Sequence, residues 1–186
     1  CFEAVTCTEL RFTSKAMDGQ TVMSLYEMEA YHDNTLTSAN HTPINSGDYT
    51  ADAIPFPETT NLLYQLTVTA NPERNGEWWK DTYALPNLTD GERVTDGYNL
   101  GKAAQTKYSA EGLTYFNFAF GKATTLNKVV FVVNGKGGNG TPVKDYAIDV
   151  KLPNGTWKRV AEKHYDDSYS LPWGTITETV CFPSIG

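Results

Sequence analysis

The sequence contains few of the residues from which zinc sites and many catalytic sites are built. Its 186 residues include three histidines and three cysteines, and no C-x-x-C pair is present. A zinc site is therefore not expected, because structural zinc takes four Cys or His ligands at characteristic spacings. No G-x-S-x-G elbow and no nucleophile, histidine and acid arrangement is visible. We expect a protein that is not an enzyme.

Positive charge and long apolar runs are also scarce. Lys and Arg number 15 against 22 Asp and Glu, so the net charge is −7, and a nucleic-acid partner would require a basic surface. No apolar run approaches the roughly 18 residues of a membrane-spanning helix. The sequence opens at Cys1 without an initiator Met or a signal peptide. We expect a mature or excised portion of a larger product, whose other domains are candidate partners.

The cysteines lie near the two ends of the sequence, at Cys1, Cys7 and Cys181. An odd count leaves one thiol over if a disulfide forms. Two alternatives remain open, a bridge between Cys7 and Cys181 that ties the two ends together, and three free thiols.

Residues that favour β-strands are abundant. Aromatic residues make up 12% of the chain, Thr is frequent, and long helical runs are missing, which indicates an all-β protein. Alternating apolar residues bounded by turn signals predict strands at 63–70, 113–120, 126–133, 146–152, 157–161 and 175–182. Many short strands of this kind indicate a β-sandwich. Within the fifth of these strands we expect Trp157 to lie in the core.

Residues 8–31 are predicted to form a β-hairpin around a turn at 17–20. Alternation in its second strand places Glu27 and Glu29 on one face. The other face takes Tyr26, Met28 and Ala30. Residues 32–61 are rich in Thr, Asn, Ser and Pro with little periodicity, and we expect a long surface linker there.

The segment 86–98 is an acidic loop with two Asp-Gly pairs, at Asp90-Gly91 and Asp96-Gly97. Each pair favours a tight turn, because Gly accepts a positive φ and Asp hydrogen-bonds its own backbone. Such a loop exposes carbonyl oxygens beside carboxylates, which are the ligands that calcium prefers. An ordinary acidic loop without a metal is the alternative.

Several motifs in order resemble the discoidin family, also called the coagulation factor 5/8 type C domain, which overlaps carbohydrate-binding module family 32. They are L-T-D-G at 88–91, F-A-F-G-K at 118–122 followed by L-N-K-V-V at 126–130, Y-A-I-D-V at 146–150, and N-G-T-W-K-R-V at 154–160. The resemblance implies a jelly-roll β-sandwich with the galactose-binding-like fold. Two departures stand out, Asn117 in place of the family's Asp, and L-P-N-G at 152–155 in place of its Ser-Asp-Gly hairpin.

The closing hairpin of the family is missing after Cys181, but T-E-L-R-F at 8–12 and L-Y-E-M-E-A-Y at 25–31 resemble it. We therefore expect one circularly permuted domain, since domain termini often lie close together. Residues 1–31 are then its closing hairpin, 32–61 a surface linker and 62–186 its main body. The alternative is that residues 1–31 complete a preceding tandem domain.

The resemblance also implies a structural calcium ion, held in the family by the acidic loop and a glutamate of the closing hairpin. At the matching positions the side-chain ligands are Asp90 and Glu27. Backbone carbonyls near Asn87, Arg93 and Thr95 would complete the shell.

The function implied is that of a lectin-like carbohydrate-binding module in an extracellular or cell-surface protein. Aromatic rings stack on the apolar face of a sugar while polar groups hold its hydroxyls. The loop candidates for contact with a glycan or glycoprotein are Trp78, Trp79, Arg93, Tyr98, Asn99, His164 and Trp173. The alternative is a cell-surface adhesion module that binds a protein partner.

Overall fold

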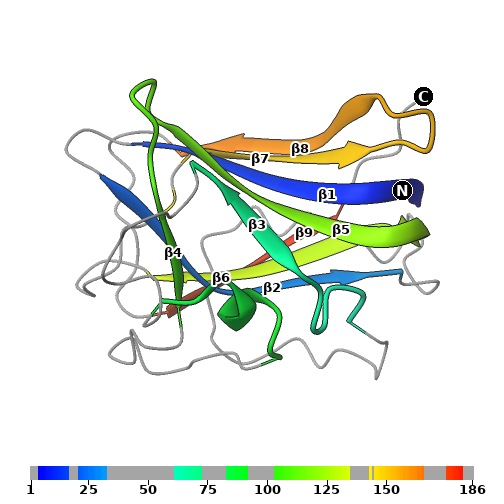
Figure 1. Cartoon of the computed structure of the whole chain (residues 1–186), viewed down its shortest axis with the longest axis horizontal. Helices are drawn as coiled ribbons and strands as arrows, with labels where there is room; N and C mark the ends of the chain where they lie inside the picture. The colour runs from blue at the N-terminus through cyan, green and yellow to red at the C-terminus, as the bar shows by residue number, and fades with distance from the viewer. Residues whose placement is uncertain are drawn as a thin grey trace.

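The computed structural model describes residues 4–16, 21–32, 61–72, 83–91, 103–134, 143, 145–165 and 175–181. These residues form an all-β sandwich of two antiparallel sheets (Figure 1), which confirms the predicted fold class. The strands are β1 (Val5–Lys15), β2 (Val22–Tyr31), β3 (Val68–Asn71), β4 (Ala104–Lys107), β5 (Leu113–Leu126), β6 (Lys128–Asn134), β7 (Asp145–Lys151), β8 (Trp157–His164) and β9 (Thr175–Cys181). In the described part, no helix is long and apolar enough to cross a membrane.

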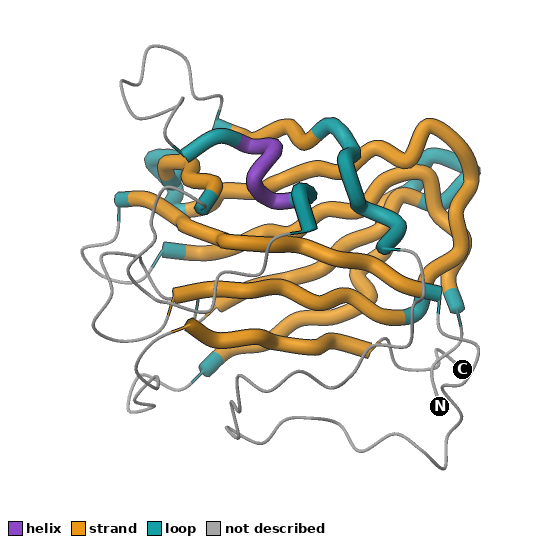
Figure 2. The backbone as a smooth tube through the Cα atoms, turned by 90° about the horizontal axis from the view of Figure 1, so that it is seen from below, coloured by secondary structure: helices purple, strands orange, loops and turns teal. Residues whose placement is uncertain are grey.

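One layer is a five-stranded sheet in the order β3-β5-β1-β7-β8, and the other is a four-stranded sheet in the order β4-β2-β6-β9. A short 3-10 helix, η1, spans Leu85–Leu88. Pro86 lies in its first turn, where the missing amide hydrogen costs nothing. This helix contacts β2, β3 and β4 and is the purple segment in Figure 2. The segment that carries η1 also carries Asp90.

An aromatic cluster joins the two sheets through the core. The ring of Phe131 on β6 meets Phe12 on β1 edge-on at 4.8 Å and Tyr146 on β7 edge-on at 4.9 Å between centroids. Phe12 and Tyr146 stack at 5.6 Å within the five-stranded sheet. Each such pair adds about 0.5–1.5 kcal/mol to the free energy gained by burying its surface. The cluster thus fixes how the two layers face each other.

The predicted hairpin over 8–31 is wrong, although both of its strands exist. β1 lies between β5 and β7, and β2 lies between β4 and β6 in the other sheet. Both edges of each strand are therefore occupied by other partners. β1 and β2 therefore belong to different layers of the sandwich.

A register shift between Leu25 and Glu27 on β2 changes which side chains share a face. Met28 and Ala30 enter the core as predicted, but Tyr26 packs beside Val132, away from that core. The extra residue of a β-bulge breaks the period of two. The prediction that Tyr26 shares the face of Met28 is therefore wrong.

Other differences concern strand ends and the cysteines. The strand predicted at 63–70 is shorter, because residues 62–65 form turns and β3 begins at Val68, while β4 was not predicted at all. The turn at 153–156 does join β7 and β8 as a hairpin, with Leu152 N donating to Thr156 O at 2.8 Å. Cys7 is a buried free thiol, so the bridge to Cys181 does not form.

Candidate functional site

Glu27 is the most unusual side chain among the described residues. It lies on β2 with 0% of its surface exposed, and neither carboxylate oxygen makes a hydrogen bond of normal geometry, although the side chain of Asp90 and the backbone of Gly91 interact with it. Burying an ionised carboxylate without a partner costs several kcal/mol, so such groups normally pair, coordinate a metal or take up a proton. The burial of Glu27 therefore indicates that a cation or a proton belongs beside it.

Acidic neighbours make it still less favourable for Glu27 to ionise without a cation. Burial raises the pKa of Glu27 from 4.5 to about 9, with further contributions from the charges of Glu29 and Asp90 and from a hydrogen bond with the Asp90 side chain. The Gly91 amide acts in the opposite direction. The structure therefore brings Glu27 and Asp90 together, as the calcium prediction requires, although they are far apart in the sequence.

The acidic loop beside Glu27 is held by hydrogen bonds of its own. Asn87 Nδ2 donates to the Ala103 carbonyl at 3.2 Å, and Thr89 Oγ1 donates to the Leu66 carbonyl at 3.1 Å. Gly91 has φ of +83°, a conformation that glycine adopts without strain. The described part of the loop, 86–91, is thereby positioned before any ligand arrives.

The described ranges contain no group of three Asp, Glu, His or Cys side chains placed to hold a metal. A cation at Glu27 and Asp90 would therefore take its remaining ligands from backbone or water oxygens, as calcium often does. Asn87 lies in η1, which contacts the strand that carries Glu27. Arg93 and Thr95 lie outside the described residues.

A second feature is a hollow of about 520 Å³ on the outer side of the five-stranded sheet. His164, a predicted ligand-binding residue, lies in its wall at the end of β8. The other lining residues are Thr13, Lys15, Leu113, Asp145, Tyr146, Ala147, Arg159, Glu162 and Lys163. Acidic, basic and apolar side chains thus surround one space.

Ion pairs fix the polar side chains of this hollow. Arg159 binds Asp149 through two nitrogens, at 3.0 and 3.3 Å, and Glu162 through a third at 3.0 Å. The hydrogen bond to Asp149 raises the pKa of the Arg159 guanidinium, which stays charged. His164 Nδ1 lies 3.3 Å from the carboxylate of Asp145. The side chains of Arg159, Glu162 and His164 are half-exposed or more, so the hollow presents solvent-accessible donors and acceptors.

A buried network anchors the same end of β8 to the other sheet. Glu178 on β9 accepts hydrogen bonds from Tyr146, from Tyr165 at 3.1 Å, and from Lys163 at 3.1 Å. Because Lys163 and Tyr165 flank His164, this network holds the wall of the hollow in place. Its polar atoms are paired, so we assign it a structural role.

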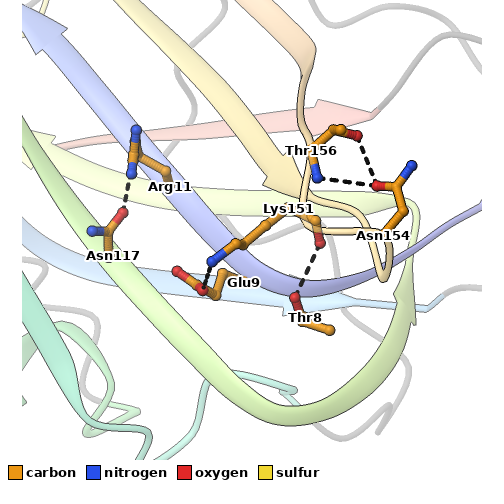
Figure 3. A network of polar contacts seen from close by, with 7 residues as sticks. All are labelled: Thr8, Glu9, Arg11, Asn117, Lys151, Asn154 and Thr156. Atoms are coloured by element: carbon orange, nitrogen blue, oxygen red, sulfur yellow. Dashed lines mark hydrogen bonds and ion pairs between the residues drawn. The ribbon is translucent and has the colours of Figure 1, made fainter.

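The other end of the outer face carries an aromatic and cationic stack. The Arg11 guanidinium lies 3.9 Å from the centroid of Trp157 and 4.4 Å from that of Tyr115. Its Nε donates to Asn117 at 2.8 Å, as Figure 3 shows. Trp157 is 37% exposed, so the prediction that it lies in the core is wrong. Its strand is the edge strand β8, where Trp157 points away from the core.

Of the predicted glycan contacts, only His164 lies within the described residues. Trp78, Trp79, Arg93, Tyr98, Asn99 and Trp173 lie outside them. Sequence reasoning missed Arg159, Asp145 and Trp157. The alternation along β7 and β8 could have identified them as outward-facing, because Asp145, Ala147 and Asp149 occupy every second position opposite the core.

Comparison of the chain with protein-family models, with curated proteins and with solved structures found no match. The resemblance to the discoidin family therefore stays a prediction, carried by the motifs alone.

Proposed function

We propose that this protein is a non-catalytic carbohydrate-binding module of an extracellular or cell-surface protein. The observation that carries the proposal is the hollow at His164, in which paired charged groups border the apolar side chains Leu113 and Ala147. Sugars present hydroxyls around small apolar patches, so they suit a site that offers hydrogen-bonding groups and apolar surface together. The carboxylates of Asp145 and Glu162 are engaged with His164 and Arg159, which suits holding hydroxyls more than delivering protons.

Arg159 is the side chain best placed to test the glycan site. Replacing Arg159 with Ala removes a donor that is fixed at the hollow by two carboxylates, and we expect at least a tenfold loss of affinity, or about 1.4 kcal/mol. Binding is measured for the best ligands of a glycan array by titration calorimetry. The matched control is Lys122→Ala, which removes an exposed cation on β5 outside the hollow and should leave affinity unchanged.

The adhesion alternative gives a different result in the same experiment. A module that recognises a protein surface would bind cells or a purified partner with no effect of free sugars. Equal loss of glycan binding in the Arg159 and Lys122 variants would indicate general electrostatics and contradict a site at the hollow.

We further propose that Glu27 and Asp90 hold a structural calcium ion. The support is the buried carboxylate of Glu27, which has no basic partner among the groups that act on it and lies beside the second acidic side chain of Asp90. Calcium would neutralise the two carboxylates and would bind the folded state only, so it would stabilise the sandwich by mass action. Its role is separate from the hollow, which lies on the other sheet.

A further inference from the structure

The outer face of the five-stranded sheet continues beyond the hollow, along β8, to Trp157. In the register of β7 and β8, His164 lies opposite Asp145, Arg159 opposite Asp149, and Trp157 opposite Lys151. At about 3.3 Å per residue, the distance from Trp157 to His164 is roughly 23 Å. We use the name β8 face for the outward side chains of β1, β7 and β8. The β8 face is much longer than a single sugar ring.

The charges of the β8 face balance, although the chain as a whole carries a net charge of −7. Its cations are Arg11, Lys15, Lys151 and Arg159, and its anions are Glu9, Asp145, Asp149 and Glu162. Several of them are joined to one another. Lys151 and Glu9 pair at 2.7 Å, as Figure 3 shows, and Arg159 bridges two carboxylates. A ligand of strong charge would find no net field here, whereas a neutral polar chain would meet alternating donors and acceptors.

Trp157 supplies an aromatic surface at the far end of the β8 face. Arg11 lies between Trp157 and Tyr115, and is itself held by Asn117. A ring held in this way loses little rotamer freedom when a ligand stacks on it, which lowers the entropic cost of binding. Leu113, 46% exposed, adds apolar surface at the opposite end. With Leu113 of the neighbouring strand β5, the β8 face therefore has apolar contacts at both ends and hydrogen-bonding groups between them.

We propose that the β8 face binds an extended, uncharged polysaccharide chain that runs along β8 from the hollow to Trp157. This inference rests on the proposed glycan-binding function and specifies its ligand as the interior of a neutral chain, not a single terminal sugar. The hollow at His164 and Arg159 holds one part of the chain. Trp157 stacks against a sugar ring at the other end.

Affinity electrophoresis in native gels tests this with neutral polysaccharides (xylan, galactomannan and mixed-linkage β-glucan) and the anionic polymers heparin and polygalacturonate. The wild-type protein is expected to be retarded by at least one neutral polymer and by neither anionic one. For the retarding polymer, affinity for its oligosaccharides, measured by calorimetry, should rise with chain length until the ligand spans the face. Trp157→Ala should weaken polymer binding about tenfold or more, and Trp157→Phe should recover part of it.

The controls separate a binding role from a structural one. Tyr64, 53% exposed, is an aromatic residue outside the β8 face, and Tyr64→Ala should bind like wild type. The melting temperature of each variant is measured in parallel, and an unchanged melt with lost binding assigns Trp157 to the ligand site.

The two proposals fail in different ways. If Arg159→Ala abolishes binding while Trp157→Ala has no effect and a monosaccharide binds as tightly as the polymer, the extended site is refuted and the glycan-binding function stands. Retardation by the anionic polymers alone refutes the neutral ligand. If no polysaccharide and no array glycan binds, both proposals are wrong.

Discussion

A chain that lacks residues 1–31 is expected to lose its cooperative unfolding transition. The deletion removes β1 from between β5 and β7, and β2 from between β4 and β6. It also removes Phe12, Leu10, Leu25 and Met28, all fully buried. Each layer would be left with two separated parts and unpaired strand edges. Circular dichroism and calorimetry of the purified fragment 32–186 measure the effect.

Point substitutions on β1 provide the matched control for this deletion. Phe12→Ala leaves a cavity in the aromatic cluster and should cost about 3–5 kcal/mol in the free energy of unfolding. Thr13→Ala, on the outward side of the same strand, should cost less than about 1 kcal/mol. If the fragment 32–186 melted cooperatively at the temperature of the intact chain, residues 1–31 would belong to a preceding domain and the permutation proposal would fall.

Much of the fold could be predicted, because strand formation leaves a local record in the sequence. The alternation of Leu10 and Phe12 with Arg11 and Thr13 is the burial pattern that β1 adopts. What alternation does not encode is the partner. Residues 8–31 read equally well as a hairpin or as two strands of opposite sheets, and the choice depends on β5 and β7, more than 90 residues further along the chain.

The site could be predicted in part, and the reason differs from residue to residue. The proximity of Glu27 and Asp90 was implied by the resemblance to the discoidin family, and it requires that residues 8–31 belong to this sandwich. Trp157 was misplaced because a tryptophan on a strand is consistent with either face, and only the register with Lys151 decides between them. The hollow was missed since its walls come from three strands that are separate in the sequence.

Removal of calcium is expected to lower the melting temperature, because the ion that Glu27 would bind stabilises the folded state. At a free calcium concentration 100 times the dissociation constant, the folded state gains about 2.7 kcal/mol. For a domain of this size that corresponds to roughly 5–10 °C. Differential scanning calorimetry of chelator-stripped protein with and without added calcium measures the shift. A calcium titration that shows neither heat nor a thermal shift would refute the metal site.

The metal-free protein should also lose stability as the pH rises. Glu27 has a pKa of about 9 in the folded state against 4.5 ordinarily, so between these values the folded state binds more protons than the unfolded state. Linkage then lowers the free energy of unfolding with increasing pH, by up to about 1.4 kcal/mol per pH unit. The loss should begin above about pH 4.5 and end near pH 9. Bound calcium should flatten this dependence, because it stabilises the ionised carboxylate.

Glu27→Gln separates the metal from the buried charge. The amide has nearly the same shape and cannot ionise, so in chelator at pH 8 the variant should melt above the wild-type protein. Calcium should narrow this difference, because it stabilises the wild-type protein, whereas the variant lacks the carboxylate ligand and gains no stability from the ion. Glu111→Gln, an exposed carboxylate in the turn before β5, should keep the wild-type response to both calcium and pH. If Glu27→Gln responded to calcium like wild type, the ion would be bound elsewhere and Glu27 would simply remain protonated in the folded protein.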